Sequence, residues 1–190
     1  MKLKSYFYFA LFLSSIISCK KETLYQDLPN EGEISVLTYN VAGLPQGINS
    51  DQFPLKHTHL ISPLLNNYDV VNVQEDFAYH DSLYKYITLP YKSDFVANQV
   101  FGDGLNTVSK IPILDFTRTK WNKCNGTDCL TPKGFSFCRL RFNKNVSVDL
   151  YNVHCNAGSD NADYAARRKN IEQLCEYINK IPILPIKQLF

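Results

Sequence analysis

Short apolar segments separated by turn-forming residues recur along the chain. We expect strands over residues 33–45, 68–75, 102–121, 134–142 and 146–154. The first is interpreted as a buried strand that ends at Gly43 and Pro45, and the third is interrupted at Pro112. The last two alternate apolar with polar residues and are joined by the polar sequence NKN, which predicts a hairpin.

Three other segments repeat apolar residues at helical spacing. We expect helices over residues 55–67, 79–87 and 160–180. Pro63 should kink or break the first of them. In the third, the apolar residues from Ile171 to Ile178 follow i, i+3, i+4, i+7 spacing, and Asp160 or Asn161 can cap its start. A strand-rich chain with intervening helices indicates an α/β or α+β fold with a mixed sheet.

The first residues have the pattern of an export signal. Lys2 and Lys4 precede the apolar run YFYFALFLSSII, which is too short for a membrane span. The following IISC resembles a bacterial lipobox, so residues 1–18 are interpreted as a signal peptide, Cys19 as the lipidated residue and 19–32 as a polar tether. This predicts a protein of the bacterial cell envelope, anchored to the membrane by lipid. An ordinary secretory signal is the alternative.

Cysteine usage fits an exported protein. Cys124 and Cys129 lie in CNGTDC, a loop rich in turn formers, and are candidates for a local disulfide in an oxidising compartment. A zinc site is the competing interpretation, but the spacing is wrong for a knuckle and no histidine lies beside the loop.

The net charge of +2 is spread along the chain and gives no basic footprint of a nucleic-acid binder. It does not exclude a nuclease, which can hold phosphates through a metal.

Polar residues end three of the predicted strands and define the candidate site. The first strand carries Asn40 near its end, the second ends in Glu75 and the last in His154. Strand ends are favoured ligand sites in layered α/β proteins. A carboxylate and an amide oxygen suit Mg²⁺ or Ca²⁺, and a nearby histidine could protonate a leaving oxygen or hold a phosphoryl oxygen. Together they suggest metal-assisted phosphodiester cleavage.

Each of these residues also has a structural interpretation. Asn40 could cap a turn, Glu75 could be a solvated strand end, and His154 could be an ordinary edge histidine. The order and context of the three favour the functional interpretation.

Five blocks carry a resemblance to a known superfamily. LTYNVAGLP, DVVNVQE, GLNTVSKIPI, KGFSFCRL and LYNVHCNAG follow the block order of the endonuclease/exonuclease/phosphatase superfamily, over about residues 33–180. The resemblance implies the deoxyribonuclease-I-like fold, a four-layer α/β sandwich. NVAGLP, DCLTPKGFSF and HCNAGSDNADYAARRKNIEQL are most similar to its bacterial neutral sphingomyelinase and phospholipase-C-like branch.

The resemblance implies a role for each candidate. Asn40 and Glu75 match the positions that hold a catalytic divalent metal, Mg²⁺, and His154 matches the histidine that contacts the scissile phosphate. The implied substrate is a phosphodiester. The resemblance favours a phospholipid and does not exclude nucleic acid or inositol phosphates.

Two blocks of that superfamily have no match. They resemble GDFN, with a water-activating aspartate, and SDH, whereas this chain closes on INKIPILPIKQLF. We therefore interpret 33–190 as the N-terminal portion of the domain, truncated at its C-terminus, and expect one sheet whose inner face lacks a partner. The functional expectation is an impaired phosphodiesterase; an inactive fragment or a non-catalytic surface binding protein is the alternative.

Overall fold

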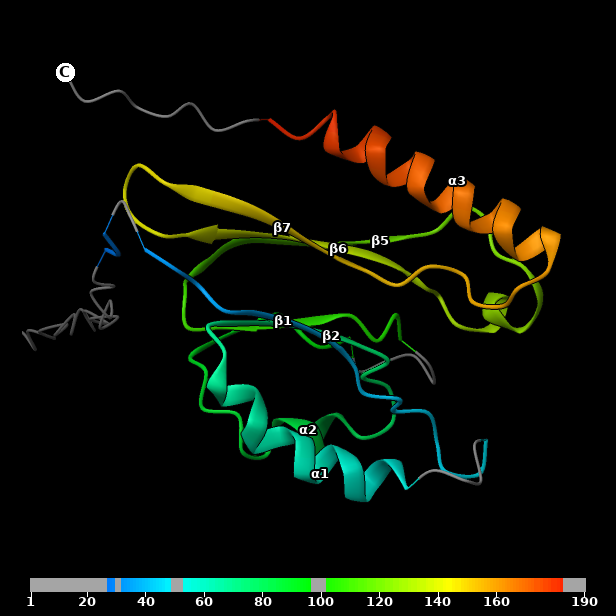
Figure 1. The fold of residues 1–190 in the computed structure, drawn as a ribbon, viewed down its shortest axis with the longest axis horizontal. Helices are drawn as coiled ribbons and strands as arrows, with labels where there is room; N and C mark the ends of the chain where they lie inside the picture. The colour runs from blue at the N-terminus through cyan, green and yellow to red at the C-terminus, as the bar shows by residue number, and fades with distance from the viewer. Residues whose placement is uncertain (1–26, 30–31, 49–52, 97–101, 183–190) are drawn as a thin grey trace, which may run out of the picture.

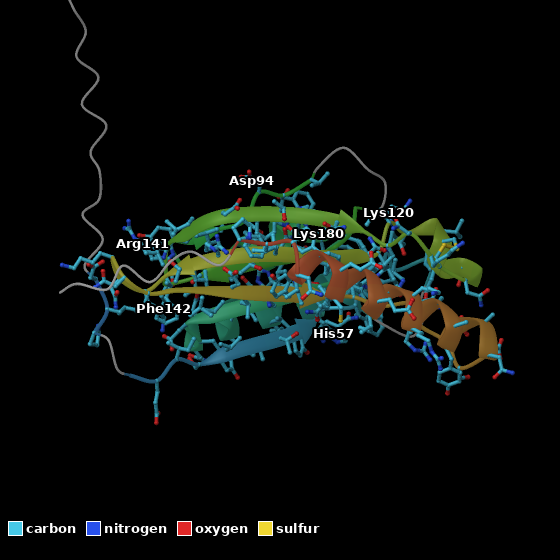
Figure 2. The ribbon with its side chains drawn as sticks, turned by 90° about the horizontal axis from the view of Figure 1, so that it is seen from above. His57, Asp94, Lys120, Arg141, Phe142 and Lys180 are labelled. Carbon is cyan, nitrogen blue, oxygen red and sulfur yellow. A yellow bond between two sulfur atoms is a disulfide. The ribbon has the colours of Figure 1, made fainter. Side chains whose placement is uncertain are left out.

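The computed structural model describes residues 27–29, 32–48, 53–96 and 102–182. Two β-sheets pack face to face, with α1 and α2 outside one sheet and α3 outside the other (Figures 1 and 2). The expected signal peptide 1–18, Cys19 and most of the tether 19–32 lie outside the described residues. Within the described ranges, no helix has the length and apolar character needed to cross a membrane.

The helices and strands follow the predicted order. The strands are β1 Val36–Asn40, β2 Val70–Gln74, β3 Tyr91–Lys92, β4 Asn106–Ser109, β5 Ile113–Lys120, β6 Gly134–Arg141 and β7 Ser147–Val153. The helices are α1 Pro54–Leu64, α2 His80–Tyr84 and α3 Asn161–Ile178, with short 3₁₀ turns at Leu65–Asn67 (η1) and Gly126–Leu130 (η2).

The first sheet, sheet A, has the strand order β1-β2-β4-β3 and is mixed: β1 and β2 are parallel, and the other pairs are antiparallel. The second sheet, sheet B, has the order β5-β6-β7 and is antiparallel throughout. The β6–β7 hairpin is the one that the alternation predicts. In sheet A, Asn40 pairs with Gln74, so the end of β1 lies beside the residue that precedes Glu75.

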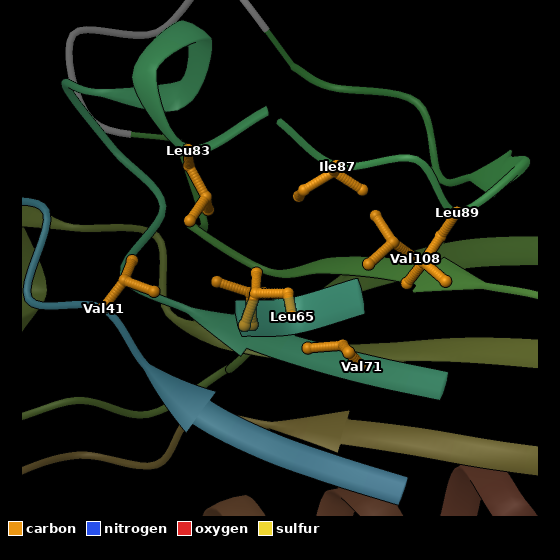
Figure 3. Packing of buried hydrophobic residues seen from close by; sticks show 8 residues of the cluster. Val41, Leu65, Val71, Leu83, Ile87, Leu89 and Val108 are labelled. Carbon is orange, nitrogen blue, oxygen red and sulfur yellow. The ribbon is translucent and has the colours of Figure 1, made fainter. Parts of the chain in front are cut away.

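Two apolar clusters hold the layers together. One lies between sheet A and its helices (Figure 3) and contains Val41, Leu65, Val71, Val73, Leu83, Ile87, Leu89 and Val108. The other joins the sheets and contains Val70, Ile111, Cys138 and Leu140. Full burial of each such aliphatic side chain contributes about 1.5–3 kcal/mol, so packing rather than helix or strand propensity dominates the fold.

The expectation of a single sheet with an unpartnered inner face was wrong. The break at Pro112 ends the pairing of sheet A, and the chain continues as β5 in sheet B. The described chain therefore contributes strands to both sheets, and their inner faces cover each other through the second cluster. The predicted fold class, a partial four-layer sandwich of the deoxyribonuclease-I-like type, is confirmed as a mixed α+β fold with two sheets and few helices (Figure 1).

The first strand also differs from its prediction as a buried strand. Because β1 forms the edge of sheet A, most of its residues are exposed, including Val36 and Tyr39. The apolar pattern of an edge strand resembles that of a central one, since sequence does not show whether a neighbouring strand follows. The helix limits agree better: α1 ends one residue after Pro63, and Asp160 is the N-cap of α3.

Candidate active site

The structure brings the three predicted site residues together. Asn40 ends β1, Glu75 follows β2, and His154 follows β7. The Asn40 side-chain amide donates to Glu75 Oε1 at 2.8 Å, and His154 Nε2 lies 3.5 Å from the same oxygen. One oxygen of Glu75 therefore contacts both Asn40, at the end of β1 in sheet A, and His154, which follows β7 of sheet B. Side chains of Glu75 and His154 are 21% and 13% exposed, so the site opens to solvent on one side.

The backbone at Glu75 adopts a left-handed conformation, with φ of 58°. Its carbonyl oxygen accepts hydrogen bonds from the amides of Gly43 (3.0 Å) and Phe77 (2.9 Å). A Cβ on Gly43 would lie 2.4 Å from that oxygen, so this approach of backbone to backbone requires glycine. The tight turn directs the Glu75 side chain toward Asn40, and the sequence alone did not predict it.

Gly104 supports the Glu75 turn from the other side, at φ of +66°. We expect Gly104→Ala to destabilise the protein by about 2–4 kcal/mol, because its Cβ would lie 2.6 Å from the Phe77 ring and 2.9 Å from Glu75 Cα. Gly126→Ala is the matched control: its φ is +60°, but nothing lies within 4 Å of the added Cβ. Urea unfolding should show a loss of only about 1 kcal/mol for that control. Equal losses would mean that the contact with the turn is unimportant.

The buried carboxylate of Asp76 helps to hold the turn at Glu75 in place. Asp76 accepts a hydrogen bond from the Asn106 side chain at 2.7 Å, and its other contact is with His80 Nδ1 at 2.6 Å. Arg118 in turn donates to Asn106 Oδ1 at 2.7 Å. A buried carboxylate needs such partners to offset its desolvation, so Asp76 is fixed in place directly after Glu75. Sequence analysis missed this residue; the only signal was an acidic residue next to the strand-end glutamate.

His154 is held at its backbone on both sides. Its amide donates to the Gly134 carbonyl at 3.0 Å, and the indole of Trp121 donates to the His154 carbonyl at 2.8 Å. The imidazole Nδ1 is buried and has no hydrogen-bond partner in the described part of the chain. The backbone contacts therefore position this side chain, and Nε2 is the ring nitrogen directed at Glu75.

Burial lowers the pKa of His154, and the positive charge of Lys133 lowers it further. Glu75 and Asp128 act in the opposite direction. Lys133 forms an ion pair with Asp128 at 2.8 Å, and both side chains are largely buried. These two charged residues beside His154 were not predicted. Asp128 immediately precedes Cys129, and Lys133 lies four residues after it. Their closeness to the predicted disulfide loop is the sequence feature that could have suggested them.

The predicted cysteine pair is joined in the structure: Cys124 and Cys129 form a disulfide with an S–S distance of 2.05 Å. Its loop contacts the segment that follows His154. The Asn125 amide donates to the Asn156 side chain at 2.7 Å, and the Asn125 side chain donates to Asp163 at 2.8 Å. The disulfide loop is thus attached to the same segment that carries the histidine.

The donor set fits a hard divalent cation. Glu75 supplies a carboxylate. The Asn40 amide oxygen accepts from the Ala42 amide at 2.9 Å and keeps a second lone pair for a cation. Mg²⁺ in proteins is commonly held by one or two carboxylates, with waters and substrate oxygens completing its shell. In the described ranges, no group of three or more His, Cys, Asp or Glu side chains is arranged to hold a metal.

The fold is shared with several solved structures. A β-hairpin deletion mutant of Staphylococcus aureus beta toxin matches with a TM-score of 0.69 and 19% identity, over 80% of this chain and 64% of that chain. Sphingomyelinase C from Streptomyces griseocarneus matches with a TM-score of 0.67 and 20% identity, over 80% and 61%. Danio rerio TDP2 in complex with a single-strand DNA product gives 0.60 and 18%, over 80% and 57%. This chain has the deoxyribonuclease-I-like fold.

Sequence comparison defines the relationship more narrowly. Sphingomyelinases from Mycobacterium bovis and Mycobacterium tuberculosis are 38% identical over 157 residues, which is 78% of this chain. The chain is a homologue of these sphingomyelinases. It spans about a third of the length (31%) of these curated relatives. No family model matches the chain. A beta toxin variant solved with bound magnesium ions is a further neighbour, with a TM-score of 0.68 and 19% identity over 80% of this chain and 61% of that chain.

Proposed function

We propose that this site hydrolyses phosphodiesters with the aid of Mg²⁺, and that the substrate is a sphingomyelin-like phospholipid. The observation that carries the proposal is the shared Glu75 oxygen, which lies 2.8 Å from the Asn40 amide and 3.5 Å from His154 Nε2. A candidate metal ligand and a candidate proton donor thus meet at one point that is open to solvent.

Each residue has a defined task in this proposal. Glu75 and Asn40 would hold the cation, which when bound neutralises charge on a phosphoryl oxygen. His154 would donate a hydrogen bond through Nε2 to the scissile phosphate and then give its proton to the leaving oxygen. The backbone bonds to Gly134 and Trp121 keep the imidazole in place.

The proposed location follows from the N-terminal sequence and the substrate. We propose that residues 1–18 direct export, that Cys19 carries the lipid, and that the tether holds the domain near the cell envelope. A lipid anchor keeps an enzyme close to a substrate embedded in a bilayer. The sphingomyelinase homology supports a phospholipid substrate over nucleic acid.

We further propose that this chain turns over slowly. In the described ranges, no second carboxylate makes a hydrogen bond or ion pair with His154. His154 is then the single acid–base group of this proposal, and a second such group is worth about 10²–10⁴-fold in rate.

The test is hydrolysis of sphingomyelin in mixed micelles by the purified full-length chain. We expect slow release of phosphocholine that requires Mg²⁺, stops with EDTA and returns when Mg²⁺ is restored. Hydrolysis that survives EDTA would contradict metal dependence. Binding of the micelles without any turnover would favour a non-catalytic surface binding protein or an inactive fragment.

A further inference from the structure

The candidate site is divided between two sheets whose described strands share no backbone hydrogen-bond ladder. Asn40 and Glu75 belong to sheet A, whereas His154 follows β7 of sheet B. The apolar cluster between the sheets packs them but is non-directional, so it tolerates small sliding movements. Something directional must therefore set the distance between Glu75 and His154.

Two residues of sheet B donate such bonds to sheet A: Arg118 of β5 and Asn152 of β7. Of these, Asn152 is the one on the strand that leads to His154. It lies on β7, two residues before His154, and is 2% exposed. Its side-chain oxygen accepts from the Gln74 side chain at 2.6 Å, and its side-chain nitrogen donates to the carbonyls of Val73 (2.8 Å) and Asn106 (3.3 Å). All three partners belong to sheet A, and Gln74 directly precedes Glu75.

The same set of bonds reaches the strand that carries Asn40. The Gln74 amide also donates to Thr38 Oγ1 on β1 at 2.9 Å. These hydrogen bonds are strongly directional, and leaving a buried amide unpaired is costly. A shift of β7 along sheet A would break the three Asn152 bonds at once.

We propose that Asn152 is the positioning residue that sets the separation between His154 and the Asn40–Glu75 pair. The consequence of Asn152 for catalysis rests on the proposed function. Its effect on the distance between His154 and the Asn40–Glu75 pair does not. Asn152 itself contacts neither substrate nor metal in this account.

The test compares two buried asparagines: Asn152, which hydrogen-bonds between the sheets, and Asn72, which hydrogen-bonds within sheet A. Asn72, which is 4% exposed, accepts from Thr107 Oγ1 at 2.8 Å, and both residues lie within sheet A. Asn152→Ala should lower the midpoint of urea unfolding more than Asn72→Ala, because it removes three hydrogen bonds whereas Asn72→Ala removes the one from Thr107. Backbone amide NMR signals of the full-length chain are then followed during titration with Mg²⁺.

In the wild-type chain we expect Mg²⁺ to shift the signals of Asn40, Glu75 and His154 together. Asn72→Ala should keep all three shifts, whereas Asn152→Ala should keep those of Asn40 and Glu75 and lose most of the shift at His154. An undiminished His154 shift in Asn152→Ala would overturn the proposal. If Asn152→Ala does not fold, Gln74→Met removes two bonds of the set, those to Asn152 and Thr38, and is expected to weaken the same shift. An unchanged shift there would equally contradict us.

Failure of the proposed function gives a different result. If Mg²⁺ shifts neither Asn40 nor Glu75 in the wild-type chain, the metal proposal fails, and the positioning role is measured without metal. Glu75→Gln should then move the His154 signal strongly in the wild-type background and weakly in Asn152→Ala. Equal movements in both backgrounds would reject the positioning role.

Discussion

Replacing His154 with alanine is expected to lower phosphodiester hydrolysis by this chain about 10²–10⁴-fold, the range that general acid–base catalysis supplies. The loss should appear in kcat rather than in KM, because the imidazole acts on the leaving oxygen and does not hold the lipid. The hydrogen bonds of this residue run through its backbone, so the alanine variant keeps them. Its side chain loses only the 3.5 Å contact of Nε2 with Glu75 among its described polar contacts.

His57→Ala is the matched control for this variant. His57 is exposed on α1, where Figure 2 labels it, and α1 lies outside sheet A. Initial rates on sphingomyelin micelles should be unchanged in the control. A His154→Ala protein that retains full kcat would remove this residue from the mechanism.

Replacing Glu75 with glutamine is expected to abolish activation by Mg²⁺. The glutamine side chain keeps an oxygen that can accept from Asn40, but it removes the negative charge, and a hard cation depends on that charge. Direct calorimetric titration should show weak or undetectable Mg²⁺ binding, and activity should no longer respond to EDTA.

Glu172→Gln is the matched control, because it removes one negative charge at a position away from the candidate site. Glu172 is exposed on α3, where it pairs with Lys169 at 2.6 Å. We expect Mg²⁺ binding identical to that of the wild-type chain. Unaltered Mg²⁺ affinity in Glu75→Gln would place the cation elsewhere.

The candidate site was predictable because its three residues end separate apolar segments. The sequence patterns that end in Asn40, Glu75 and His154 are short and well separated, and strand ends of a layered fold meet at common edges. The structure agrees, with one oxygen of Glu75 in contact with both other residues.

What sequence could not supply is the pairing between distant segments. The two-sheet division at Pro112 depends on which strands pair, and pairing is not encoded in the local alternation of apolar residues. For the same reason the exposed edge position of β1 was missed.

The supporting polar residues were missed for a related reason. Asn152 and Gln74 occur 78 residues apart, and their hydrogen bond exists only once the sheets have packed. Asp76 likewise resembles a solvated loop residue until Asn106 and His80 surround it. Buried polar residues are selected by tertiary contacts that a periodicity argument does not contain.

The central claim is that Asn40 and Glu75 hold a divalent cation beside His154. Its most direct test is a crystal structure of the full-length chain grown with Mn²⁺ in place of Mg²⁺, with anomalous scattering used to locate the metal. We predict one principal anomalous peak that is coordinated by the Glu75 carboxylate and the Asn40 side-chain oxygen. A peak coordinated by other residues, or no peak at this pair in metal-saturated crystals, would contradict the account.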